Sequence, residues 1–156
     1  RRQLAGGAGN HRLHVLGGGV DGAARVALLR LRDPRPALRR LAGHGTRTRA
    51  AGAAMEIGSV KLAIAECFDV LGTFTGCNAG TNGIPNLGTT RNITTVTSIT
   101  NGQIQITTGA TASVGGPGLT IIYTPTSAAG AASITWTNTG TTCNPTRGFK
   151  AGQGGC

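Results

Sequence analysis

The sequence predicts an α+β fold, with one amphipathic helix packed on a four-stranded antiparallel sheet and a C-terminal disulfide-bounded loop. Three observations predict it: an apolar stripe with a helical period, short β-branched runs separated by turn residues, and cysteines placed beside these elements. With 156 residues the chain can build one hydrophobic core of ordinary size. We therefore expect one folded domain.

The helix is predicted over residues 50–71. Its apolar side chains recur at steps of three and four, which places them on one face: Ala53, Ile57, Val60, Ile64, Phe68 and Leu71. Gly72 is expected to end the helix because glycine tolerates a left-handed backbone. Gly58 weakens the middle of the helix by up to about 1 kcal/mol.

A long surface loop and four strands are predicted next. Residues 72–91 are rich in Gly, Asn and Thr and follow neither period, which is typical of a loop. The predicted strands are residues 92–100, 103–108, 119–124 and 133–137. Asn101 and Gly102 predict a type I′ hairpin between the first two strands, since that turn needs positive φ at both positions. Apolar residues spaced by three predict a bulge in the first strand.

The four cysteines, Cys67, Cys77, Cys143 and Cys156, predict two disulfides. They lack the CxxC spacing of zinc ligands, and the surrounding sequence is rich in Thr, Gly and Asn. Both features indicate an oxidising compartment outside the cytoplasm. Three pairings are possible. We favour Cys67 with Cys77 and Cys143 with Cys156, because each closes a short loop worth roughly 3 kcal/mol. Residues 143–156 show no helix or strand pattern and are expected to keep their shape only through their disulfide.

The first third of the chain differs in composition from the rest. Residues 1–50 hold eleven of the fifteen basic side chains and two of the five acids, a net charge of +9, and residues 51–156 net only +1. Residues 1–50 also lack isoleucine and every aromatic residue. We expect residues 1–45 to be an atypical Arg/Gly/Ala-rich segment, either non-native sequence or an out-of-frame reading, and residues 46–156 to be the folded head.

Motifs for catalysis, metals or cofactors are weak. A G-x-G-x-x-G pattern at residues 17–22 has no return strand after it, and chance spacing in a glycine-rich segment explains it better. His11, His14 and His44 lack accompanying carboxylates or thiolates. Residues 92–94 match a glycosylation sequon but also suit an ordinary strand start. We expect no catalytic, metal or cofactor site and no small-molecule substrate.

The order of the predicted elements resembles that of a type IV pilin. The likeness is carried by A-I-A-E at 63–66, T-N-G at 100–102, L-T-I-I-Y-T-P-T at 119–126 and S-I-T-W-T at 133–137. It covers residues 46–156 and implies a type IV pilin-like head with a variable loop at 72–91. It also implies that Cys143 and Cys156 bound the C-terminal region. The apolar segment with which pilins begin is not recognisable in residues 1–45, and no run of 18 apolar residues occurs.

This resemblance implies a structural subunit and not an enzyme. Many copies would build a pilus filament outside the cell, for adhesion, surface motility or DNA uptake, after anchoring in the inner membrane. The expected partners are further copies, the pilus assembly machinery, and DNA or a host or abiotic surface. Arg147 and Lys150 form a basic patch and are candidate surface or ligand contacts. Leu62, which lies off the apolar stripe, is a candidate subunit contact.

Two other functions stay open. A minor or competence-type pilin could hold DNA on its basic C-terminal loop. A basic cytosolic protein could bind nucleic acid through the Arg-rich N-terminal segment, although that segment has no aromatic residue to stack on a base. Salt-sensitive DNA binding by the head would favour the first, and free thiols on all four cysteines would favour the second.

Overall fold

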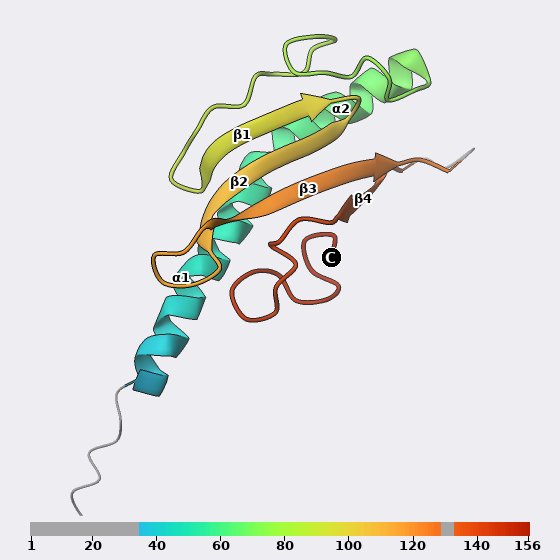
Figure 1. Cartoon of the computed structure of the whole chain (residues 1–156). Coiled ribbons are helices and arrows are strands. Elements are labelled where there is room, and N and C mark those ends of the chain that lie inside the picture. The colour runs from blue at the N-terminus through green and yellow to red at the C-terminus, as the bar shows by residue number, and fades with distance from the viewer. Residues whose placement is uncertain (1–34, 129–132) are drawn as a thin grey trace, which may run out of the picture. The chain divides into compact units, whose positions relative to one another are not determined.

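The computed structural model describes residues 35–128 and 133–156, with side chains from residue 44 onward. The described part contains α1 (Arg35–Glu56), α2 (Gly58–Leu71), β1 (Ile93–Thr100), β2 (Gln103–Thr111), β3 (Gly118–Thr126) and β4 (Thr135–Asn138). The strands form one antiparallel sheet in the order β1-β2-β3-β4, and the helices lie across one face of it (Figure 1). The predicted fold class is confirmed.

The two helices form one bent helix. The helical assignment is interrupted only at Ile57, where the N–H donates to Ala53 O at 3.2 Å and the carbonyl accepts from Lys61 N at 3.0 Å. Hydrogen bonds therefore run through the bend. The bend lies next to Gly58, the residue expected to weaken the helix.

The helix begins at Arg35, so the predicted start near residue 50 is wrong. Residues 35–42 are mostly Arg, Ala and Leu, which favour helix. Thr46 and Ala50 are buried, so this part of the helix packs against the rest of the head. The division of the chain at residue 45 falls within α1, and the interpretation of residues 1–45 as non-native sequence stays a prediction. At the other end Gly72 takes a φ of 66° and donates to Phe68 O at 2.8 Å, which confirms the predicted helix end.

The sheet is a meander with the predicted hairpin at its first turn. Asn101 and Gly102 have φ values of 50° and 77°, as a type I′ turn requires. The register of β1 on β2 shifts twice, which confirms the bulged first strand. β2 extends to Thr111, beyond its predicted end, because a further register shift absorbs two extra residues of β2 opposite β3. β4 begins at Thr135, slightly later than predicted.

The apolar stripe of the helix covers the inner face of the sheet. Ala53, Ile57, Val60 and Ile64 are completely buried. They pack against inward side chains at alternate strand positions, which are mostly isoleucines: Ile93, Ile99, Ile104, Ile106, Ile121 and Tyr123. Burial of one such isoleucine contributes about 1.5–3 kcal/mol. Leu71, the last residue of the predicted stripe, is 44% exposed because the end of α2 extends past the hairpin (Figure 1).

The long loop after α2 is fixed at its base. A disulfide joins Cys67 to Cys77, with the Cα atoms 5.9 Å apart. The Cys77 carbonyl accepts from Gly102 N at 2.8 Å, and Ala79 N donates to Ile99 O at 3.0 Å. These bonds fasten the loop to the β1–β2 hairpin, and it then runs back beside β1 (Figure 1).

The C-terminal loop contains the second predicted disulfide, between Cys143 and Cys156, whose Cα atoms are 5.5 Å apart. The expectation that this loop keeps its shape only through the disulfide is wrong. Thr142 N donates to Thr120 O at 2.9 Å, and Phe149 N donates to Thr142 O at 2.6 Å. Residues 139–142 thus continue the sheet by donating to carbonyls of β3, and the loop is hydrogen-bonded in turn to Thr142 and Asn138.

Two glycines of the bent helix should respond oppositely to alanine. No atom lies within 4 Å of a Cβ built at Gly58, so Gly58→Ala should raise the free energy of unfolding by about 0.5–1 kcal/mol. A Cβ at Gly52 would lie 2.5 Å from Asn92 Nδ2, which donates to Glu56 Oε1 at 2.7 Å. Gly52→Ala should therefore break that bond and lower the free energy of unfolding. Urea unfolding measures both, and a shift of the same sign in the two variants would contradict this packing.

Removal of the second disulfide should loosen the C-terminal loop without unfolding the sheet. Cys143→Ala with Cys156→Ala should lower the free energy of unfolding by up to about 3 kcal/mol. Because hydrogen bonds to Thr120 remain, faster amide exchange should be confined to residues 139–156. The matched control removes the first disulfide and should speed exchange in the loop after α2 instead. Loss of protection in β2 after removal of the second disulfide would overturn this account.

Candidate interaction surfaces

The two predicted basic contacts, Arg147 and Lys150, lie on the C-terminal loop but in different surroundings. Arg147 Nε donates to Thr111 O at 2.6 Å and Nη2 to Thr111 Oγ1 at 3.3 Å, so this half-buried side chain fastens the loop to the end of β2. Lys150 is exposed, and its hydrogen bonds are made by the backbone: its N–H donates to Gln153 Oε1 at 3.5 Å and its carbonyl accepts from Gln153 N at 3.0 Å. The basic patch predicted for an external ligand is therefore carried mainly by Lys150.

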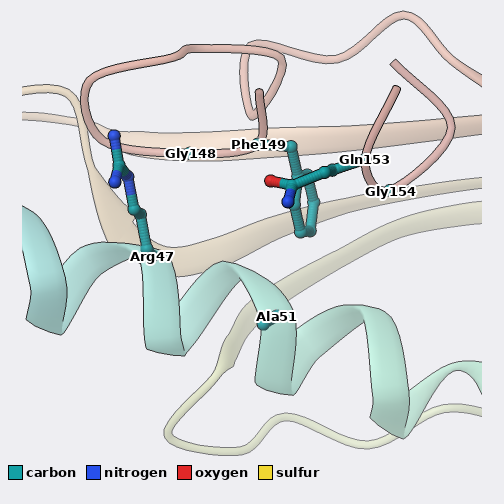
Figure 2. A pocket seen from close by; sticks show the side chains of 6 residues that line it. All are labelled: Arg47, Ala51, Gly148, Phe149, Gln153 and Gly154. Carbon is teal, nitrogen blue, oxygen red and sulfur yellow. The ribbon is translucent and has the colours of Figure 1, made fainter. Parts of the chain in front are cut away.

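A pocket of about 440 Å³ opens between α1 and the C-terminal loop (Figure 2). It is lined by Arg47, Ala51, Gly148, Phe149, Gln153 and Gly154. Arg47 extends from the helix toward the loop, and Phe149 and Gln153 line the pocket from the loop (Figure 2). Nη2 of Arg47 donates to the carbonyl of Pro145, but its Nε is buried and has no hydrogen-bond partner. We call this the Arg47 pocket.

The chemistry of the Arg47 pocket suits an anionic group carried on an apolar stem. A guanidinium attracts a carboxylate, the Gln153 amide can donate a hydrogen bond, and Phe149 with Ala51 offers an apolar contact. The sequence alone does not indicate this pocket. Arg47 and Gln153 are more than one hundred residues apart, and no local pattern brings them together.

The outer face of the bent helix carries exposed apolar side chains. Leu62, the predicted subunit contact, is 63% exposed, and Met55 is 81% exposed. Seven residues separate them, which is about two helical turns, so both lie on the face opposite the buried stripe. Met55 could have been found in the sequence by this spacing.

The end of α2 forms a second exposed surface, which we call the α2 tip. It combines two carboxylates with two apolar side chains: Glu66, Asp69, Val70 and Leu71. A hollow of about 330 Å³ lies beside them, between the helix and Asn82 of the following loop. The last turn of α2 contains no basic residue.

A lysine lies against the two strand aromatics on the inner side of the sheet. Lys61 Nζ is 3.3 Å from the centroid of the Tyr123 ring and 5.0 Å from that of Trp136, and the two rings pack edge to face. Burial lowers the pKa of Lys61 from 10.5 to about 8 and raises the pKa of Tyr123. The ring faces attract the ammonium and offset part of the desolvation cost. The stability of the head should therefore depend on pH through this cluster.

Other sequence motifs gain no support as sites. The Asn92 amide donates to Glu56 Oε1, so the asparagine of the predicted sequon is engaged in packing. Residues 17–22, His11 and His14 lie outside the described residues. His44 is exposed. Among the described residues, no three His, Cys, Asp or Glu side chains are close enough to hold a metal ion. None of the described helices has the length and apolarity of a membrane span.

Lys61 should make the head more stable as the pH rises from about 8 to 10. In this window the folded state loses the Lys61 proton while the unfolded state keeps it, so the unfolded state binds more protons and stability increases with pH. Above about pH 10 the raised pKa of Tyr123 has the opposite effect. Lys61→Met keeps the packed stem and should remove the increase, whereas Lys150→Met should retain it. Denaturant unfolding from pH 7 to 10 measures this, and an unchanged slope in Lys61→Met would contradict the assignment.

Comparison with known proteins agrees with the geometry. The family model Pilin, a bacterial filament protein, matches residues 46–148, about two thirds of the chain. The match runs from α1 through the sheet into the C-terminal loop. No curated protein and no solved structure matches the chain. The chain therefore belongs to the pilin family, with a type IV pilin-like fold, and is a structural subunit of a bacterial pilus.

Proposed function

We propose that this pilin polymerises into a helical filament through the outer face of its bent helix. The observation that carries the proposal is the exposure of Met55 and Leu62 on the face opposite the sheet. Two large apolar side chains on one helix face are better placed against another helix than in water, and burial of each would contribute about 1.5–3 kcal/mol. In a helical filament the same contact recurs at every subunit, so a modest contact is multiplied along the fibre.

The filament would present the C-terminal loop to its surroundings. Lys150 is exposed, and hydrogen bonds to β3 support the loop that carries it. These features suit contact with an acidic or polar surface during adhesion, surface motility or DNA uptake. As in the family, we expect the subunit to be held in the inner membrane until the pilus assembly machinery adds it to an extracellular filament.

DNA binding by a minor or competence-type pilin is the weaker candidate. The patch expected for it combined Arg147 with Lys150, but the Arg147 guanidinium is occupied by Thr111. The Lys150 ammonium alone would neutralise one phosphate, which contributes little to DNA affinity. Nucleic-acid binding through the Arg-rich N-terminal segment concerns residues that lie mostly outside the described part, and it also stays a prediction.

Leu62→Glu should prevent filament formation while the head still folds. A glutamate at this position would place a charge in the proposed contact, and the lost apolar burial alone weakens each contact by roughly tenfold or more. Electron microscopy of filaments, together with circular dichroism of the head, measures the two effects. Val114→Glu is the matched control, because Val114 is also strongly exposed but lies in the β2–β3 loop. Normal filaments from Leu62→Glu would refute the proposed role of this face.

A further inference from the structure

The α2 tip carries two carboxylates that have no bonding partner in the described part of their own subunit. Glu66 and Asp69 are exposed, and in the described part their carboxylates have no hydrogen bond or ion pair. Both lie close to the C-terminal end of α2, where the helix dipole is negative and favours cations, and the last turn holds no base. The two carboxylates are therefore repelled by the negative end of the helix dipole. A cation from outside the subunit would offset this repulsion.

Apolar side chains project beside the acids. Val70 is 83% exposed, and it lies four residues after Glu66, so both occupy one face of the last turn. The tip thus presents a carboxylate and a branched apolar side chain together, with Leu71, 44% exposed, next to them.

The Arg47 pocket offers the complementary groups. Arg47 contributes a guanidinium that keeps its positive charge although Nη2 donates to the Pro145 carbonyl, and Phe149 and Ala51 contribute an apolar surface beside it (Figure 2). A carboxylate on an apolar stem, as the α2 tip presents it, matches this pocket in both charge and polarity.

One subunit cannot join the two surfaces, because they belong to distant parts of the same helix. Nineteen residues separate Arg47 from Glu66, roughly 28 Å along a helix axis. A second copy can join them. Two copies related by a two-fold axis at either surface would instead bring like charges together, which is unfavourable.

We propose that the α2 tip of one subunit docks into the Arg47 pocket of the next. The two patches differ, so the contact is heterologous, and repetition of such a contact gives an open filament rather than a closed dimer. The inference rests on the proposed polymerisation and deepens it, since it specifies a second, head-to-tail contact besides the outer helix face. It also gives that contact a direction along the fibre.

Thiol crosslinking between two singly substituted full-length chains tests the contact. All four native cysteines are in disulfides, so Val70→Cys and Ala51→Cys each introduce the only free thiol. Filaments or concentrated solutions of the mixed variants are treated with a short bismaleimide, which does not exchange with disulfides. We expect crosslinked pairs that join residue 70 of one chain to residue 51 of another. Glu66→Lys with Asp69→Lys, added to the Val70→Cys chain, should reduce the yield by about tenfold, equivalent to ~1.4 kcal/mol.

Val114→Cys mixed with Ala51→Cys is the matched control, because Val114 is as exposed as Val70. Filaments in which the residue 70–51 yield does not exceed this control would overturn the head-to-tail contact and leave the proposed filament function intact. Crosslinks only between two copies of Val70→Cys would also overturn it, by showing a symmetric contact. Residue 70–51 crosslinks in solution from a chain that forms no filaments would support the contact and count against the proposed polymerisation.

Discussion

Burial of the helix stripe against the isoleucine-lined face of the sheet is the interaction on which the rest of the structure depends. The inward side chains of the first three strands are almost all β-branched or aromatic, and in the described part the helix stripe is what covers them. Helix and sheet each have one apolar face, so packing those faces together sets the layer order and leaves the opposite faces to water. The long loop, the bulges and both disulfides then adapt the remaining chain to this pair of layers.

The same packing decides which surfaces are free for assembly. Ile57, Val60 and Ile64 are used inward, so Met55 and Leu62 must face outward. The C-terminal loop continues the sheet through its hydrogen bonds to β3, and this brings it beside α1, where the Arg47 pocket forms between them. The pocket thus forms between two segments that are far apart in the chain, and their contact has no local sequence signal.

Several arginines in the head bind main-chain carbonyls, and no ion pair is formed among the described side chains. Arg49 donates to Gly109 O at 3.1 Å, Arg147 to Thr111 O, and Arg47 to Pro145 O. A guanidinium has five N–H donors and can satisfy carbonyls that a bulged strand end leaves without strand partners. A carbonyl does not neutralise the charge, however. The helix and the loops around these residues therefore stay basic, while the unpaired acids gather at the α2 tip.

The sequence by itself determined the element types, the pairing of the first two strands through the type I′ hairpin at Asn101, and the two short-range disulfides. These features depend on local periods, turn chemistry and short loop closure, which a single sequence contains. The tertiary structure alone decided that Arg147 is tied to Thr111, that Arg47 and Gln153 line one pocket, and that Lys61 lies over Tyr123. Each of these depends on partners distant in the chain, because a side chain's burial and hydrogen bonds are set by what the fold places beside it and not by its neighbours in sequence.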